Sequence, residues 1–208
     1  MLFSNDPAAL VGILVALLVG LTFHEFSHAF VADQLGDHRP RALGRVSLNP
    51  ADHIDPLGAI MLLVAGFGWA KPVPVNPAAL RPGRRAMSAV AAAGPLANVV
   101  VALVAAVSFR LLDTLGLEGF AREVAFYTVV FNFVLALFNL LPIPPLDGYN
   151  IVLPFLPIRL AWQVQAYAQY GMFLLLGLVL ISSVMPGPGP LSWIFELASV
   201  LTRLAIGA

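Results

Sequence analysis

A long uncharged run of apolar residues begins at residue 7 and leads into the pentapeptide HEFSH at residues 24–28. Residues four apart on a helix lie on one face, so His24 and His28 can turn both imidazoles toward one metal ion. Glu25 then lies beside the ion, where a carboxylate can act as a general base. With the pentapeptide included, the run reaches about residue 32, long enough to cross about 30 Å of hydrocarbon at about 1.5 Å per residue. The pattern predicts a zinc site inside a membrane-spanning helix.

The composition indicates that the whole chain is an integral membrane protein. Hydrophobic residues make up 60% of it and charged residues 11%, against about 25% charged in a typical soluble domain. A cleaved signal peptide does not explain the first run, because no basic residue precedes it and it ends in His and Glu. The 11 basic residues balance the 11 acidic ones, so nothing indicates a nucleic-acid partner. Cysteine is absent, which leaves His, Asp and Glu as the strong metal ligands.

Further apolar runs predict further helices, at residues 86–112, 124–141, 161–185 and 191–206. We therefore expect an all-α polytopic membrane protein with about five transmembrane or interfacial helices. The last run carries Glu196 and Arg203 seven residues apart, hence on one face. A position along the membrane interface therefore competes with a full span for this run.

The shorter apolar run at residues 56–70 is predicted to re-enter the membrane instead of crossing it. As a helix its 15 residues would reach only about 22 Å. If it re-enters, seven basic residues share one face of the membrane, whereas the opposite face holds Arg110 and Arg122. The seven are Arg39, Arg41, Arg45, Lys71, Arg81, Arg84 and Arg85. The positive-inside rule then puts these cations in the cytoplasm. We expect a short re-entrant hairpin or extended segment near the active site, and an active site toward the cytoplasmic side of the cell membrane.

A hydrolytic zinc site needs a third protein ligand besides two histidines. Asp147 is the strongest candidate among the other acidic residues, because it ends an apolar segment, residues 139–147, whose three prolines break the helix. A carboxylate at membrane depth is costly without a partner, and no Lys or Arg follows it before Arg159. The alternative is that Asp147 lies in a cytoplasmic loop and caps the next helix.

Motifs at three separated places resemble those of the site-2 protease family of intramembrane zinc metalloproteases. HEFSH matches the first motif of that family, and residues 139–148 match its NxxPxPxxDG motif. The sequence GPLAN at residues 94–98 resembles the GPxxN element between them. Residues 48–56, which include LNP and His53, resemble the corresponding segment of compact bacterial members of the family. The resemblance covers residues 24–148, with the motifs in the same order as in the family.

The resemblance implies a catalytic core of three transmembrane helices, with one zinc ion per chain held by His24, His28 and Asp147. It implies that Glu25 takes a proton from a zinc-activated water and passes it to the leaving amine. It also implies that the substrates are transmembrane segments of other proteins. Neither a PDZ insertion nor a C-terminal CBS domain fits within 208 residues.

Negative charge that develops on the scissile carbonyl oxygen calls for a donor besides the metal. Asn139, Asn98 and His53 are the candidates. The two asparagines lie in apolar helical runs, where the alternative role is to tie helices together. His53 stands between Asp52 and Asp55, which could orient it over the site or make it a partner of a ligand, but a loop histidine is most often only solvated.

The proline-rich stretch at residues 72–77 predicts extended chain, because proline fixes its own φ and disfavours helix for the residue before it. A substrate helix must unwind before water can attack its peptide bond. An extended edge could then pair with the unwound chain, as in β-augmentation. The alternative is that the stretch is only a connector.

The sequence as a whole favours an intramembrane zinc endopeptidase that acts in regulated intramembrane proteolysis. We expect one membrane-embedded domain over residues 1–208, with a catalytic core at about 7–153 and C-terminal helices at about 160–206. The expected partners are transmembrane protein substrates and the lipid bilayer, with no nucleic acid, and a homo-oligomer is compatible with the sequence. A metal transporter is the competing class, although it has no need of a Glu between two ligating histidines. A binder that recognises transmembrane helices without cutting them is the third class.

Overall fold

The computed structural model describes residues 7–65, 68–185 and 187–207, and it is helical apart from short connections. No β-strand occurs among the described residues, where Ile54 and Ala70 form an isolated antiparallel bridge. In chain order the elements are α1 (Pro7–Gln34), α2 (Arg39–Ala42), η1 (Pro50–Asp52), α3 (Pro56–Ala65), α4 (Ala86–Thr114), α5 (Phe120–Asn139), α6 (Asp147–Val152), η2 (Leu153–Phe155), α7 (Ile158–Tyr167), η3 (Ala168–Tyr170), α8 (Gly171–Val184) and α9 (Ser192–Ile206).

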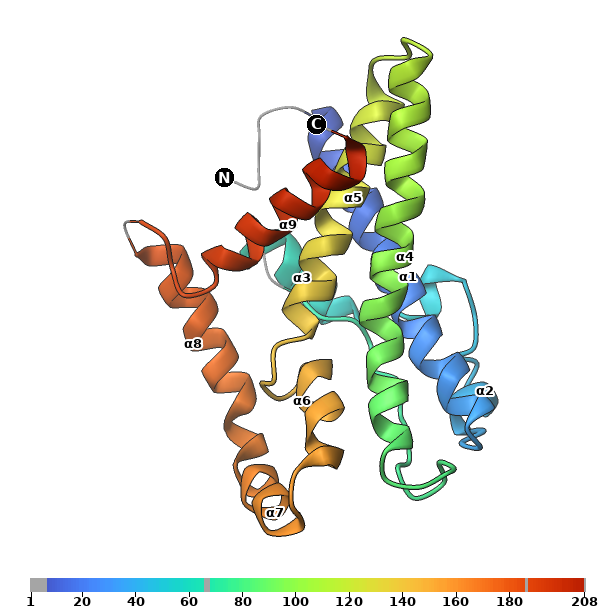
Figure 1. Cartoon of the computed structure of the whole chain (residues 1–208), viewed down its shortest axis with the longest axis vertical. Coiled ribbons are helices and arrows are strands. Elements are labelled where there is room, and N and C mark those ends of the chain that lie inside the picture. The colour runs from blue at the N-terminus through green and yellow to red at the C-terminus, as the bar shows by residue number, and fades with distance from the viewer. Residues whose placement is uncertain (1–6, 66–67, 186, 208) are drawn as a thin grey trace.

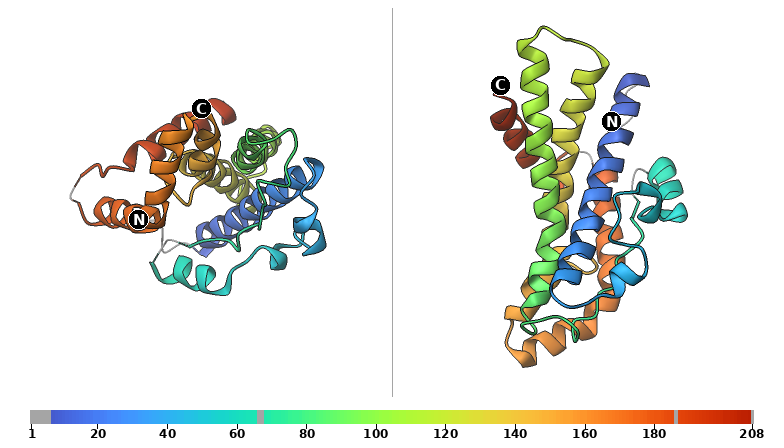
Figure 2. Two further views of the ribbon diagram at one scale, coloured as in Figure 1. Left: turned by 90° about the horizontal axis from the view of Figure 1, so that it is seen from below. Right: turned by 90° about the vertical axis from the view of Figure 1, so that its right-hand side faces the viewer.

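The core of the molecule is the packing of α1, α4 and α5 against one another, seen in both views of Figure 2. Small side chains dominate where α4, α5 and α9 meet: Ala102, Ala105, Ala106 and Ala198 are buried there beside Val129 and Phe133. Small residues let helix backbones approach closely, which matters in a membrane, where lipid tails are as apolar as leucine. The apolar runs of the sequence therefore become a bundle in which buried alanines allow α4, α5 and α9 to pack closely.

Four helices within the described part of the chain are long and apolar enough to cross a membrane. They are Ala9–Gln34, Ala86–Thr114, Phe120–Asn139 and Ile158–Ser182, the last of which joins α7, η3 and α8. α9 has 15 residues and crosses the bundle obliquely against α5 and α4 (Figure 1). The expected all-α polytopic membrane fold is confirmed.

The two ends of the segment that contains α3 lie beside each other, as in a hairpin. α3 has ten residues, about 15 Å as a helix, and the bridge between Ile54 and Ala70 joins the two ends of the segment. The return is close enough to require glycine at Gly58, because a Cβ there would lie 3.0 Å from Trp69 N and nearer still to Trp69 O. Residues 66–67, which belong to the predicted re-entrant run, lie outside the described residues.

Candidate metal centre

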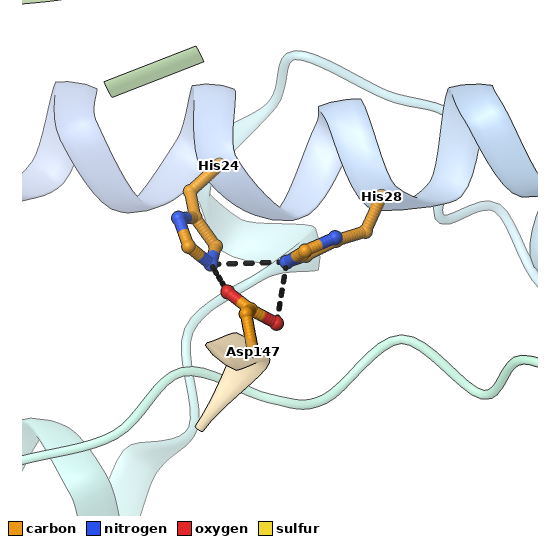
Figure 3. A group of neighbouring side chains, drawn as sticks. All are labelled: His24, His28 and Asp147. Carbon is orange, nitrogen blue, oxygen red and sulfur yellow. Dashed lines mark hydrogen bonds and ion pairs between the residues drawn. The ribbon is translucent and has the colours of Figure 1, made fainter. Parts of the chain in front are cut away.

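Three ligand groups meet where α1 faces the start of α6 (Figure 3). His24 Nε2 lies 3.0 Å from His28 Nε2 and 3.0 Å from Asp147 Oδ2. His28 Nε2 lies 3.3 Å from Asp147 Oδ1. Both histidines are buried, and Asp147 is nearly so. The two histidines of the pentapeptide and the aspartate, 119 positions beyond His28, thus form one cluster.

The hydrogen bonds of the two imidazoles leave both Nε2 atoms free for a cation. His24 Nδ1 lies 2.7 Å from Asn98 Oδ1, and His28 Nδ1 lies 2.7 Å from the carbonyl oxygen of Val90. Oxygen acceptors on both sides mean that both Nδ1 atoms carry the hydrogen and both Nε2 atoms present lone pairs. Two lone pairs facing each other at 3.0 Å repel unless a positive charge lies between them. A metal ion at the point where the Nε2 atoms converge would satisfy both lone pairs.

The donor set fits zinc. Zinc binds imidazole nitrogen at about 2.0–2.1 Å, so neighbouring ligand atoms of a tetrahedral site lie about 3.3 Å apart. The distances of 3.0, 3.0 and 3.3 Å among these atoms are close to that value. Asp147 Oδ2 is buried, and with the His24 Nε2 atom 3.0 Å away unprotonated it has no hydrogen-bond donor within the described residues, as expected of an oxygen that binds a metal. Three protein ligands leave a fourth position for water, the pattern of a catalytic site.

The chain brings Asp147 back to α1 by ending α5 early. α5 stops at Asn139, and prolines prevent the helix from continuing until Asp147 opens α6. Gly148 makes the return possible, because a Cβ there would collide with the carbonyl oxygens of Leu140 and Leu141. The break that the prolines predicted is therefore what aims the aspartate at the histidines.

Gly94 lets α4 lie directly against the histidine pair. A Cβ at this position would be 2.6 Å from His24 Nε2 and closer still to His28 Nε2. One turn further along the same face, Asn98 reaches His24 Nδ1. The two ends of the GPLAN sequence thus serve close approach and hydrogen bonding to one ligand.

A cavity of about 470 Å³ opens on the ligand cluster. Glu25 lines it together with the three ligand residues and Asn139. Apolar side chains also line it, among them Val73 and Val75 of the extended segment and Met172 and Leu175 of α8. The cavity therefore combines carboxylates and imidazoles with apolar side chains.

The three other sequence candidates differ in position. Asn139 lines the cavity and donates from Nδ2 to Leu135 O at 3.0 Å. Asn98 is fully buried behind His24, with its amide nitrogen donating to Gly20 O and Asn132 Oδ1, so it does not face the cavity. His53 is 1% exposed and bonds Ser47 O through Nε2 at 2.7 Å. It does not line the first cavity but a second, apolar one of about 200 Å³ between α1 and α3, which shares Leu21 and Trp69 with the first.

Two polar residues near the site were not among those predicted from the sequence. Asn150 lines the cavity one turn beyond Asp147, and Asn132 bonds Asn98. The available signal was an asparagine inside a long apolar run, since an amide there needs a partner. That signal does not say which partner, because the contact joins helices far apart in sequence.

Charged residues outside the bundle hold the loop after α1. Asp33 pairs with Arg41 at 2.7 Å and with the surface-exposed His38 at 2.9 Å. The hydrogen bond from the Arg39 guanidinium lowers the pKa of Asp37, with a smaller contribution from the backbone N–H of Asn76. Asp37 thus fixes the far end of the extended segment that lines the cavity.

Known proteins are similar to this chain over most of its length. The sequence pattern of peptidase family M50 matches residues 115–180, which include Asn139 and Asp147. A Bacillus subtilis protein named "Putative zinc metalloprotease YwhC" is 40% identical over 184 residues, 84% of this chain and 83% of that protein. "Putative zinc metalloprotease Rip2" is 34% identical in Mycobacterium tuberculosis over 212 residues, 96% of this chain and 80% of that protein. The Rip2 of Mycolicibacterium smegmatis is 33% identical over 203 residues, 92% of this chain and 74% of that protein. No solved structure matches the chain.

Proposed function

The chain belongs to peptidase family M50 and is a zinc metalloprotease of the membrane, and we propose that it cuts transmembrane segments of other membrane proteins. In this proposal His24, His28 and Asp147 hold one zinc ion per chain and Glu25 is the base. The observation that carries it is the convergence of two Nε2 lone pairs and an aspartate on a cavity within a bundle of apolar helices. A protease whose site lies among such helices has membrane-embedded chain as its nearest substrate.

The chemistry divides between the metal and the chain. When bound, zinc would act as a Lewis acid that lowers the pKa of a coordinated water to about 7 and polarises a carbonyl group. The Glu25 carboxylate follows His24 directly and lines the same cavity, so its oxygen can take the proton of the attacking water. The same carboxylate then gives that proton to the nitrogen of the leaving amine. Asn98 and the Val90 carbonyl keep the two imidazoles turned with Nε2 toward the cavity.

We assign different roles to the three other candidates. Asn139 has a second amide hydrogen beyond the one given to Leu135 O, and it lines the cavity, so it is our donor to the scissile carbonyl oxygen. Asn98 acts as a positioning residue for His24, since its own donors are engaged elsewhere. His53 supports the hairpin, because its carbonyl accepts from Lys71 N at 2.8 Å and its ring bonds the preceding loop.

The extended segment after the hairpin is our candidate for substrate binding. The buried guanidinium of Arg45 bonds the carbonyls of Lys71 and Pro72, and Asp37 accepts from Asn76 N, so the segment is held at both ends. Between these anchors the backbone N–H and C=O groups of Val73 and Val75 have no hydrogen-bond partner among the described residues. Both valines line the catalytic cavity. An unwound substrate could pair with this edge by β-augmentation.

We further propose that the catalytic side faces the cytoplasm and that the N-terminus lies outside. The seven cations of residues 39–85 belong to the loops before α3 and before α4, whereas Arg122 pairs with Asp113 across the α4–α5 connection. Figure 1 shows that connection at one end of the molecule and α2 with the start of α4 at the other. The excess of cations at the second end supports its cytoplasmic location.

Purified protein in detergent tests the proposal. The expected result is about one zinc per chain and cleavage of single-span proteins within their apolar segments. Glu25→Gln keeps size and removes the carboxylate, so it should retain zinc and substrate binding but show almost no cleavage. Near wild-type turnover in Glu25→Gln would contradict the role of Glu25 as the base. Cleavage confined to soluble loops would contradict the proposal that the substrates are transmembrane segments.

A further inference from the structure

A chain of three buried polar side chains runs from the metal cluster through the centre of the bundle. Asn132 on α5, Asn98 on α4 and His24 on α1 belong to three different helices. The two asparagines are 0% exposed and His24 is 5% exposed. Asn98 Nδ2 donates to Asn132 Oδ1 at 3.0 Å, and Asn98 Oδ1 lies 2.7 Å from His24 Nδ1.

Backbone carbonyls fix which way each amide in this chain points. Asn132 lies 2.9 Å from Thr128 O, which can only accept, so the Asn132 nitrogen faces Thr128 and its oxygen faces Asn98. Asn98 lies 3.1 Å from Gly20 O, so its nitrogen serves both Gly20 O and Asn132 Oδ1. The Asn98 oxygen is thereby left for His24 Nδ1–H, and the lone pair of His24 must be at Nε2.

The chain also has its full complement of hydrogen bonds, which makes it stiff. Asn98 uses both amide hydrogens and its oxygen. Asn132 accepts from Asn98 through its oxygen, and its nitrogen lies 2.9 Å from Thr128 O and 3.5 Å from Ala16 O. A Cβ on Gly20 would lie 2.7 Å from Asn132 Oδ1, so α1 packs directly on this amide. In a low-dielectric interior, turning any of these groups away from its partner would cost free energy, because the group would be left buried without a hydrogen bond.

We propose that Asn132 is a positioning residue of the metal centre, which fixes the tautomer and the orientation of His24 through Asn98. The inference rests on the proposed function, because it takes His24 to be a zinc ligand. Asn132 touches neither the cavity nor a ligand, so its effect must pass through Asn98. Without the Asn132 oxygen, the Asn98 nitrogen keeps Gly20 O as its acceptor but loses the second one. The Asn98 amide is then held less firmly, so its oxygen is placed less exactly against His24 Nδ1 and the tautomer with the lone pair on Nε2 is less strongly favoured.

Zinc affinity of the purified protein, measured by competition with a chelator, tests the proposal. Asn132→Leu keeps the approximate volume and removes the acceptor, and it should weaken zinc binding about tenfold, the lower end of the range for partners of metal ligands. Asn132→Asp, in its protonated form, keeps an oxygen facing Asn98 and an O–H facing Thr128 O, and it should recover most of the loss. Thr128→Val is the matched control, because the Thr128 hydroxyl is buried one turn away on α5 and bonds only Val124 O of its own helix.

A cobalt-substituted sample separates positioning from helix packing. The visible spectrum of bound Co²⁺ reports ligand geometry, so it should change in Asn132→Leu and stay unchanged in Thr128→Val. A lower unfolding temperature in Asn132→Leu with wild-type zinc affinity and cobalt spectrum would overturn the proposal, since the amide would then only join helices. If the leucine variant does not fold, Asn132→Thr is the substitute, because a shorter side chain cannot reach Asn98.

The outcomes also distinguish this inference from the proposed function. A wild-type protein that binds no zinc contradicts the proposed function itself. A wild-type protein that binds zinc, together with an Asn132→Leu variant indistinguishable from Thr128→Val, contradicts only the role of Asn132.

Discussion

Replacing Gly94 with alanine should displace either the histidine pair or α4, because the added Cβ has no room beside the imidazoles. The added Cβ would lie 2.6 Å from His24 Nε2, whereas ordinary contact begins at 3.4 Å, so the atoms must separate by 3.4 − 2.6 = 0.8 Å or more. Zinc–ligand distances hold within about 0.2 Å. Moving the imidazoles by several times that tolerance breaks the site. Moving α4 instead pulls Asn98 away from His24 Nδ1 and Val90 O away from His28 Nδ1.

Either response costs zinc binding, so we expect Gly94→Ala to weaken it by about 100-fold or more, the upper end of the range for a single lost partner group. Chelator competition measures the affinity, and cleavage of a single-span substrate should fall with it. Gly177→Ala is the matched control: it is also a helical glycine in a membrane-spanning segment, but its Cβ would meet nothing within 4 Å. Wild-type zinc affinity in Gly94→Ala would refute the close packing of α4 on the histidine pair.

Three further predictions test other parts of the proposal. Asp147→Asn keeps the shape but weakens the ligand, so metal analysis should show zinc and activity lost together, unlike Glu25→Gln; full zinc and activity would exclude Asp147 as third ligand. Proline at Val73 or Val75 removes a backbone donor from the free edge, so turnover of long substrates should fall at unchanged zinc content, and unaltered cleavage in both variants would favour a simple connector. Arg84→Cys introduces a thiol into a chain without cysteine. A membrane-impermeant reagent added outside intact cells should leave it unlabelled, whereas labelling there would reverse the topology.

Local patterns were sufficient to predict the long helices and the proximity of His24, His28 and Asp147. The apolar runs at 86–112 and 124–141 became α4 and α5, because an uninterrupted apolar stretch of that length has few stable alternatives to a helix. His24 and His28 are one turn apart, so their convergence is a property of one helix. Asp147 could be identified because a carboxylate within a broken apolar helix needs a positive partner.

Contacts between helices could not be predicted in the same way. Nothing in the run that contains Asn132 indicates that its partner is Asn98, 34 positions earlier, because that depends on how α5 is rotated against α4. Asn98 was a candidate donor to the substrate, yet it lies behind His24 for the same reason. His53 has charged neighbours in sequence, but its ring turns toward Ser47 O of the loop before the hairpin, a direction set by tertiary packing.

The position of the extended segment suggests how an apolar bundle can admit a reaction that needs both water and exposed peptide bonds. Peptide groups released from a substrate helix cannot be left unpaired beside lipid, because each would cost several kcal/mol. Val73 and Val75 line the cavity, and their unpaired backbone groups could offer hydrogen bonds that replace part of what unwinding breaks. The free edge covers only residues 73–75, since Arg45 and Asp37 engage the groups beyond it. About one turn of substrate helix can therefore be compensated, so segments that unwind easily over a single turn should be the preferred substrates.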